Sequence, residues 1–231
     1  MIIGIMGFAR SGKNATADIL KRRGPEKGLS FEEVAFADEV KRSAMKLFDF
    51  TEEQSWGVTK DVIDQRYPRE HVSSTADGDL CACCKTPHAQ WHVKQCFLTP
   101  RYAQQTTGTE GARACYPDIW VEKAISAARL LQEGGYSYRR AIGIRSDMAC
   151  PPMHVVIPDV RFINEVTGIK RAGGRVYRVK RAGIDKPPHD HPSETEQLKI
   201  KDGKLDGVIH NDSDLEHLEK EVVQTILGRL L

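Results

Sequence analysis

The sequence lacks several features that would mark particular classes of protein. Although 40% of its 231 residues are hydrophobic, no apolar run approaches the roughly 20 residues of a membrane-spanning helix. Neither charge dominates, since 34 basic and 32 acidic residues leave a formal net charge of +2, which gives no general reason to expect nucleic-acid binding. Aromatic residues are few, at 7%, and the composition is that of a globular protein. We predict no membrane contact and no stable nucleic-acid binding.

The chain also lacks the marks of a secreted protein. The first ten residues have an apolar start but no leading basic region and no small-residue cleavage site, so we expect no signal peptide. A disulfide framework spreads its cysteines along the chain, whereas four of the six cysteines here fall within residues 81–96. A reducing, cytoplasmic location is therefore expected, with Cys115 and Cys150 as ordinary thiols.

Strand and helix patterns alternate along the chain, which predicts an α/β fold. Buried strands are expected at residues 2–6, 34–37, 154–158, 175–181 and 207–210. Amphipathic helices are expected at residues 12–23, 38–48, 101–107, 118–132, 161–172 and 213–230, with Asp38 and Ser213 as caps. Residues 136–152 are expected to be irregular. The alternation is typical of a mainly parallel sheet covered by helices on both faces, in three layers.

Residues 57–99 differ in composition from the rest of the chain. They hold few aliphatic residues, many polar ones and the cysteine cluster. A segment so poor in apolar side chains builds little core of its own, while the whole length suits one domain of generous size. We therefore expect a single domain, residues 1–231, that carries an insertion at 57–99.

Residues 7–14, GFARSGKN, fit the phosphate-loop pattern G-x-x-x-x-G-K, with Asn14 where Ser or Thr is usual. The motif follows a predicted buried strand and precedes a predicted helix, as it requires. Its glycines let backbone N–H groups turn toward phosphate oxygens, the helix adds its positive amino end, and Lys13 would reach the β- and γ-phosphates. The alternative is a glycine-containing turn with a solvent-exposed lysine. The predicted ATP contacts are Ala9, Arg10, Ser11, Gly12, Lys13, Asn14 and Ala15.

A second polar pair follows another predicted strand. In VVIPDVR (155–161), Asp159 and Arg161 lie just past the carboxyl end of the run, the edge where ligands bind in an open parallel sheet. An aspartate there can hold magnesium through water, and an arginine can stabilise charge on a transferring phosphoryl group. Asp159 also lies close to the start of the next helix, so a capping role is the alternative, and the two roles are compatible.

Several segments together resemble the phage-type deoxynucleoside monophosphate kinases, within the P-loop nucleoside monophosphate kinase group. They occur in family order and cover most of the chain outside residues 50–99. The segments are GFARSGKNATAD (7–18), FADEVK (36–41), RYAQQTTGTEGAR with DIW (101–113, 118–120), PDVRFINE (158–165), RVKRAG (178–183), HPSE (191–194) and KDGKLDGVIHNDSDLEHLEKEV (201–222).

This resemblance implies a three-layer P-loop kinase fold and an enzyme that transfers the γ-phosphate of ATP to a deoxynucleoside 5′-monophosphate, with Mg²⁺. The partners would be small molecules, ATP and the monophosphate. The location would be the cytoplasm, that of the host if the protein is phage-encoded. Related kinases make a homodimer an open alternative to a monomer. Residues 57–99 would be an insertion on the acceptor side or a lid.

The resemblance also implies roles for particular residues. The catalytic set is Lys13, Asp159, Arg161 and Arg181, with Arg178 as a further candidate to clamp the phosphoryl group; one or two of these arginines are expected to be ordinary surface charges. The acceptor set is Asp38, Lys41, Gln104, Gly108, Thr109, Glu110, Arg113 and Trp120. Arg113 suits the monophosphate, because a guanidinium binds phosphate bidentately. Gln104 or Glu110 would read a base edge or a sugar hydroxyl, and Trp120 packs either on the base or in the core.

Such a reaction needs little covalent help from the protein. Two substrates must be held in line and the charge on the equatorial oxygens neutralised. The attacking phosphate oxygen is already ionised near neutral pH, so no general base is required, and we predict no catalytic histidine or cysteine. Closure over the substrates should exclude water.

The cysteine cluster has the spacing of a zinc knuckle. Cys81-x₂-Cys84 is a usual first half and His92-x₃-Cys96 a usual second half, which predicts a tetrahedral Cys₃His site. Cys83 and His88 are alternate ligands. A structural Zn²⁺ would replace the core that this segment lacks. The alternatives are a polar loop with reduced thiols and, less consistent with phosphoryl transfer, a catalytic cysteine. The family pattern does not supply this site.

Two other functions are alternatives to the deoxynucleoside monophosphate kinase hypothesis. One is a different P-loop small-molecule kinase, similar to dephospho-coenzyme A kinase, against which the acceptor segment GTEGAR (108–113) argues. The other is an ATP-dependent nucleic-acid-binding protein whose zinc knuckle grips DNA with Lys85, Trp91 and Lys94. The balanced charge and the lack of a basic stripe with stacking aromatics argue against it.

Overall fold

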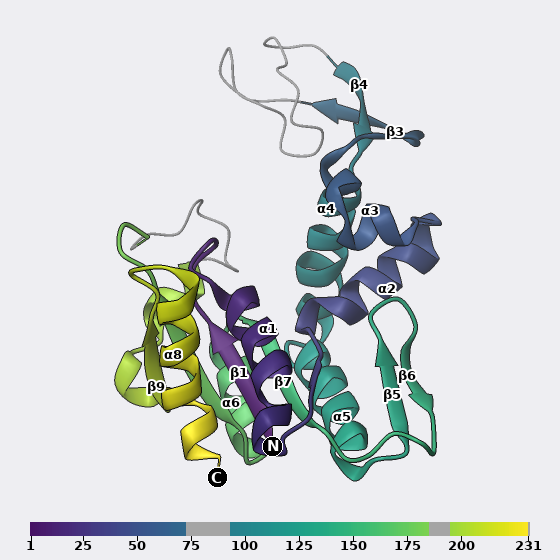
Figure 1. Ribbon diagram of the computed structural model, residues 1–231. Helices are drawn as coiled ribbons and strands as arrows, with labels where there is room; N and C mark the ends of the chain where they lie inside the picture. Colours follow the sequence, from purple (N-terminus) through teal and green to yellow (C-terminus); the bar gives the residue numbers. More distant parts are fainter. Residues whose placement is uncertain (73–92, 185–194, 231) are drawn as a thin grey trace. The chain divides into compact units, whose positions relative to one another are not determined.

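The computed structural model describes residues 1–72, 93–184 and 195–230 (Figure 1). It contains two compact units. We call Met1–Asp38 with Asp118–Leu231 the core unit, and Glu39–Pro117 the second unit. The expectation of one domain with an insertion at 57–99 stays a prediction. Within the described ranges, no helix is both long and apolar enough to cross a bilayer.

The core unit is built on a five-stranded sheet in the order β2-β7-β1-β8-β9. Every neighbouring pair is parallel, and Ile3 of the central strand lies opposite Val156 on one side and Arg175 on the other. The predicted α/β class with a mainly parallel sheet is therefore confirmed. The strands are β1 (Ile2–Met6), β2 (Phe31–Glu33), β7 (His154–Val160), β8 (Arg175–Lys180) and β9 (Gly207–His210).

Helices cover both faces of this sheet, which gives three layers (Figure 1). Side chains of β1 alternate between the faces: Ile3 and Ile5 pack with α1 and α8, while Ile2 and Met6 pack with α5 and α6. The helices are α1 (Lys13–Arg23), α5 (Ile119–Glu133), α6 (Ile163–Arg171) and α8 (Leu215–Thr225). Short 3₁₀ turns are η1 (Pro25–Lys27), η4 (Glu196–Lys199), η5 (Asp202–Lys204) and η6 (Leu227–Arg229).

Several predicted boundaries are wrong. The second strand is β2 at Phe31–Glu33 and not 34–37, because its partner β7 pairs with it from His154 onward. Consequently α2 (Phe36–Phe48) begins earlier, and Asp38 lies inside its first turn instead of capping it. Residues 136–152 are not irregular throughout, since they contain the hairpin β5 (Tyr136–Arg139) and β6 (Gly143–Ser146).

The start of the last helix is also displaced from its predicted cap. Asp214, not Ser213, is the N-cap of α8, and its side chain accepts a hydrogen bond from the backbone N–H of His217. An aspartate and a serine serve equally well as caps, so the sequence alone does not separate these adjacent positions.

The second unit contains the greater part of α2 and a small apolar cluster. Ala44 of α2 packs with Phe50, Leu98 and Ala103. The remaining elements are α3 (Glu52–Trp56), η2 (Val58–Asp61), β3 (Asp64–Val72), β4 (Val93–Leu98), α4 (Pro100–Gln105) and the π-helical stretch η3 (Thr106–Arg113). Strands β3 and β4 pair antiparallel.

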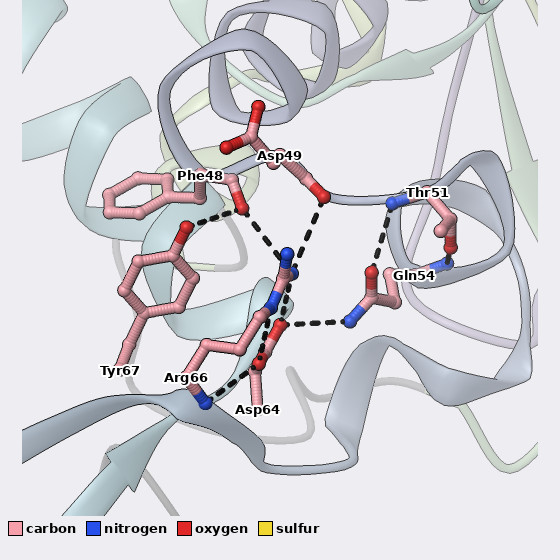
Figure 2. Close-up of polar contacts among 7 residues, drawn as sticks. All are labelled: Phe48, Asp49, Thr51, Gln54, Asp64, Arg66 and Tyr67. Atoms are coloured by element: carbon pink, nitrogen blue, oxygen red, sulfur yellow. Dashed lines mark hydrogen bonds and ion pairs between the residues drawn. The ribbon is translucent and has the colours of Figure 1, made fainter.

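A polar network fixes the start of β3 against the end of α2 (Figure 2). The Arg66 guanidinium donates to both oxygens of Asp64, at 2.6 and 3.0 Å. It also donates to the carbonyl oxygens of Phe48 and Asp49, at 3.4 and 3.3 Å, where a cation suits the helix dipole. The backbone N–H of Arg66 and the side-chain amide of Gln54 also donate to Asp64, each at 3.1 Å. The hydrogen bonds from Arg66 lower the pKa of Asp64 to about 2.

Because of this network, we expect the free energy of unfolding to fall at acid pH. The pKa of Asp64 in the folded state lies below its unfolded value, so its contribution is present above about pH 4 and is lost as pH falls toward 2. We expect Asp64→Asn to cost about 1–2 kcal/mol at neutral pH, after allowance for screening at the half-exposed Arg66, and the deficit to vanish at acid pH. Urea unfolding across this pH range measures it, with exposed Glu52→Gln as control; a deficit independent of pH would contradict the assignment.

Candidate active site

The loop between β1 and α1 has the backbone of an anion-binding turn. Gly7, Arg10 and Gly12 have φ values of 148°, 66° and 108°. Gly12 is the N-cap of α1, and no side chain among the described residues caps that helix end. The first N–H groups of a helix have no intrahelical acceptor, and the helix dipole there favours negative charge. This end of α1 is therefore suited to phosphate.

A side chain would not fit at either glycine of the motif. A Cβ on Gly7 would lie 2.5 Å from the carbonyl oxygen of Val179 and 2.6 Å from Ser11 Oγ. One on Gly12 would lie 2.5 Å from Asn211 Nδ2. Ser11 is itself only 1% exposed. The loop backbone therefore packs closely against residues that end or follow strands β8 and β9.

The polar side chains of Lys13, Asn14 and Thr16 at the start of α1 differ in where they lie. The Lys13 ammonium donates to the carbonyl oxygen of Phe8 at 2.6 Å, so it lies over the loop. The Thr16 hydroxyl donates to the carbonyl oxygen of Gly12 at 3.1 Å and is buried, which commits it to the helix. Asn14, by contrast, is exposed at the first turn of α1. Asn14, which stands where the motif usually has a hydroxyl, is therefore accessible, whereas the nearby hydroxyl of Thr16 is not.

Asp159 lies within β7, not past its end as predicted, and its carboxylate caps α2. Oδ1 accepts the N–H of Phe36 at 3.0 Å and Oδ2 that of Ala37 at 2.9 Å. Burial raises the pKa of Asp159, although these two donors and the Arg161 guanidinium act in the opposite direction. The predicted cap on the adjacent helix is therefore wrong: Phe162 is the N-cap of α6, and Asp159 caps α2 instead.

Two residues near Asp159, Asp38 and Arg161, are also held by hydrogen bonds within the core unit. Asp38 is 1% exposed, and its carboxylate accepts hydrogen bonds from Tyr138 Oη at 2.8 Å and the N–H of Ala35 at 3.1 Å. The backbone N–H of Arg161 donates to Glu165 at 2.6 Å, which orders the start of α6. Asp38 and Asp159 lie close enough for the charge of Asp38 to raise the pKa of Asp159. The structure therefore brings these two carboxylates and Arg161 together.

The two later arginines differ in their surroundings. Arg178 is held by Asp202 at 2.5 Å and donates to the carbonyl oxygen of Gln197 at 3.2 Å, so its guanidinium serves the framework. Arg181 is exposed, and its guanidinium donates to the carbonyl oxygen of Arg10 in the phosphate loop at 3.5 Å. Arg181 is thus the arginine of this pair that lies beside the loop.

In the second unit, part of the predicted acceptor set gathers around α3. Lys41 Nζ lies 5.4 Å from the centre of the Trp56 ring, a cation–π contact. Gln104 Nε2 donates to the carbonyl oxygen of Ser55 at 3.3 Å. Trp56 was not singled out from the sequence; it ends a polar helix, and no pattern distinguishes it there from a surface tryptophan.

The rest of the acceptor set lies on η3 or in the core unit. Gly108 is buried against α2, where a Cβ would lie 2.9 Å from Val40 Cγ1. π-helical turns often mark functional sites. Trp120 lies on α5 and is 5% exposed, as a core tryptophan would be. The residues that share η3 are Gly108, Thr109, Glu110 and Arg113.

The predicted zinc site falls mostly outside the described residues. Cys81, Cys84 and His92 lie there, as do the alternates Cys83 and His88. Cys96 belongs to β4, where its backbone lies opposite Arg69. Among residues 1–72, 93–184 and 195–230 there is no cluster of three or more His, Cys, Asp or Glu suited to a metal ion. Zinc at the predicted site stays a prediction.

Two buried amides at the loop were also missed. Gln197 Oε1 accepts the N–H of Gly7 at 3.2 Å, and Asn211 Nδ2 donates to the carbonyl oxygen of Ser11 at 2.8 Å. Both lie about 190–200 positions away in sequence, so local patterns carry no sign of the contact. The segment HNDS (210–213), in which Asn211 follows a strand, was the available signal.

Comparisons with known proteins extend the sequence resemblance. No protein-family model matches the chain. A curated protein of Acanthamoeba polyphaga mimivirus, described as "Putative deoxynucleotide monophosphate kinase", is 29% identical over 228 residues, which are 98% of this chain and 96% of that protein. The resemblance to deoxynucleoside monophosphate kinases that the motifs indicated is thus confirmed over nearly the whole length.

Two solved structures are similar at a lower level. Shikimate kinase from Aquifex aeolicus is 13% identical, with a TM-score of 0.44, and the match covers 100% of this chain and 99% of that one. The APS kinase CysC from Mycobacterium tuberculosis, as a Cys556Ala mutant, is 11% identical, with a TM-score of 0.42 and 98% and 96% covered.

Proposed function

We propose that this protein is a kinase that transfers the γ-phosphate of ATP to a deoxynucleoside 5′-monophosphate and forms the diphosphate. The observation that carries the proposal is the loop at residues 7–14. No side chain of the described residues caps the helix that follows the loop, and the Lys13 ammonium lies over the loop. The near full-length match to the mimiviral protein supports the acceptor class.

On the ATP side, each residue has a distinct task. The N–H groups of Gly12, Lys13 and Asn14 bind phosphate oxygens, and the Lys13 ammonium neutralises charge at the β- and γ-phosphates. Arg161 and Arg181 stabilise the phosphoryl group during transfer. Arg178 is a framework residue, because Asp202 and the carbonyl oxygen of Gln197 hold its guanidinium.

The residues present fit magnesium. Mg²⁺ keeps several waters and takes few protein ligands, all of them oxygen. Exposed Asn14 offers its amide oxygen at the loop. Asp159 is fixed by two amides, and each of its oxygens retains a lone pair for a bound water. When bound, the ion neutralises phosphate charge. Asn14 and, through water, Asp159 would hold it.

On the acceptor side, Lys41, Gln104 and the η3 residues bind the monophosphate, with Arg113 on its phosphate. Asp38 orders the start of α2, since its carboxylate is already bonded by Tyr138 and Ala35. No histidine or cysteine takes part, because the acceptor oxygen is ionised near neutral pH. The protein's contribution is alignment and charge neutralisation.

A coupled assay of ADP formation tests the proposal. We expect at least one of the four deoxynucleoside monophosphates, or a modified pyrimidine monophosphate, to raise ADP formation well above the rate with ATP alone. Dephospho-coenzyme A as acceptor and DNA titration at low salt test the two competing functions. Turnover of dephospho-coenzyme A without turnover of any nucleotide would refute the proposal, as would salt-dependent DNA binding without kinase activity.

A further inference from the structure

Asn211 reaches the phosphate loop from a strand that is not adjacent to it in the sheet. The residue follows β9, which is separated from β1 by β8. Its backbone N–H donates to the carbonyl oxygen of Lys180 at 2.8 Å, which continues the pairing of β9 with β8. Its side chain is directed to the loop, where Nδ2 donates to the carbonyl oxygen of Ser11 at 2.8 Å. Only 8% of Asn211 is exposed.

This contact sets the direction of one loop peptide. In a trans peptide the C=O and the following N–H point in opposite directions, because the group is planar. The peptide from Ser11 to Gly12 is trans. Since Asn211 holds the Ser11 carbonyl on its buried side, the N–H of Gly12 faces the opposite side, away from Asn211.

The next peptide is held in a matching way from within α1. The carbonyl oxygen of Gly12 accepts the N–H of Thr16 at 2.9 Å and its hydroxyl at 3.1 Å. By the same geometry, the N–H of Lys13 points out of the amino end of the helix. Two successive N–H groups are therefore directed outward: Asn211 sets the direction of the Gly12 N–H, and Thr16 sets that of the Lys13 N–H.

The close packing of Asn211 on Gly12 supports a role specific to the loop. A Cβ on Gly12 would lie 2.5 Å from Nδ2, so the amide rests directly against this residue. A buried amide has a strong requirement for its hydrogen bond. The Ser11 carbonyl is the acceptor that satisfies it, and the loop cannot turn that peptide over without leaving both groups unpaired.

We propose that Asn211 is a positioning residue for ATP, which orients the N–H of Gly12 toward the phosphates. This rests on the proposed function for the identity of the ligand. A hydrogen bond to a charged group contributes about 1.5–3 kcal/mol, so misdirecting this donor weakens ATP binding about 10- to 100-fold. Binding of the deoxynucleoside monophosphate does not depend on it.

Two variants of Asn211 test the role. Asn211→Asp keeps the shape but presents an oxygen to the Ser11 carbonyl, and Asn211→Ala removes the group. Both should raise the KM for ATP about 10- to 100-fold and leave the KM for the acceptor within about twofold. Calorimetry should show the same loss in ATP affinity for whichever variants fold.

Asp206→Ala is the matched control. Asp206 lies just before β9, and its carboxylate accepts the N–H of Val176 at 2.8 Å. It therefore also ties β9 to β8, but at the amino ends of these strands, whereas Asn211 lies at their carboxyl ends. We expect Asp206→Ala to lower the melting temperature without changing the KM for ATP. A rise in that KM equal to the one in the Asn211 variants would reduce Asn211 to a stabilising contact.

The outcomes separate this inference from the proposed function. Wild-type ATP affinity in both Asn211 variants would overturn the positioning role while the kinase assignment stands. If the wild-type protein binds ATP but phosphorylates no deoxynucleotide, the proposed function fails. In that case weaker ATP binding by the Asn211 variants would still support the positioning role.

Discussion

Replacing Lys13 with alanine should lower turnover of ATP and a deoxynucleoside monophosphate by about a thousandfold or more. The Lys13 ammonium lies over the phosphate loop, 2.6 Å from the carbonyl oxygen of Phe8, and is the cation that the motif aims at the β- and γ-phosphates. Positively charged groups aimed at a transferring phosphoryl group contribute about 10³- to 10⁵-fold. The coupled assay at saturating acceptor measures the loss, with the KM for ATP recorded alongside.

The control is Lys27→Ala, which removes an exposed lysine from η1, beyond the other end of α1. Its turnover should equal that of the wild type. Both variants should unfold at nearly the wild-type temperature, because the hydrogen bond from Lys13 to the loop is only partly buried. Normal turnover in Lys13→Ala would show that phosphoryl transfer does not use this loop.

The loop was predictable because its signals are local. The run at 2–6, the glycines at positions 7 and 12 and the helix that follows are contiguous, and each agrees with the next. The closing strand and helix were found for the same reason. Every residue of β1 is buried, as its continuous apolar run indicates, and its two sets of side chains meet helices on opposite faces.

What was missed depends on contacts between distant segments. The position of β2 depends on its register with β7. Two of its three residues are glutamates, so the more apolar run at 34–37 was the stronger local signal. Asp159 was expected to act near its own strand end, yet it caps α2, more than a hundred residues earlier in the chain. Gln197 and Asn211 brace the loop from similar separations. Polar residues after a strand suggest a site, but their partners come from the topology.

Gly7→Ala should be the most damaging single-methyl change in the loop. At φ of 148° an L-residue is strained, and the new Cβ would lie 2.5 Å from the backbone oxygen of Val179. Because this oxygen belongs to the backbone of β8, near the end of that strand, relief requires the loop to move. That movement would also break the hydrogen bond from the Gly7 N–H to Gln197. Strain and overpacking together cost about 2–5 kcal/mol.

The variant Gly28→Ala separates the cost of backbone strain from the cost of overpacking. Gly28 also has positive φ, at 73°, but a Cβ there would meet nothing within 4 Å. It should therefore lose only the strain energy, about 1–2 kcal/mol, and keep wild-type ATP affinity. Gly7→Ala should lose more stability in urea unfolding and, in calorimetry, at least about a hundredfold in ATP affinity, since the displaced loop no longer directs its donors. If the two variants were equally stable and bound ATP equally well, positive φ alone would explain the glycine at position 7, and the close approach of β8 would have no part in holding the loop.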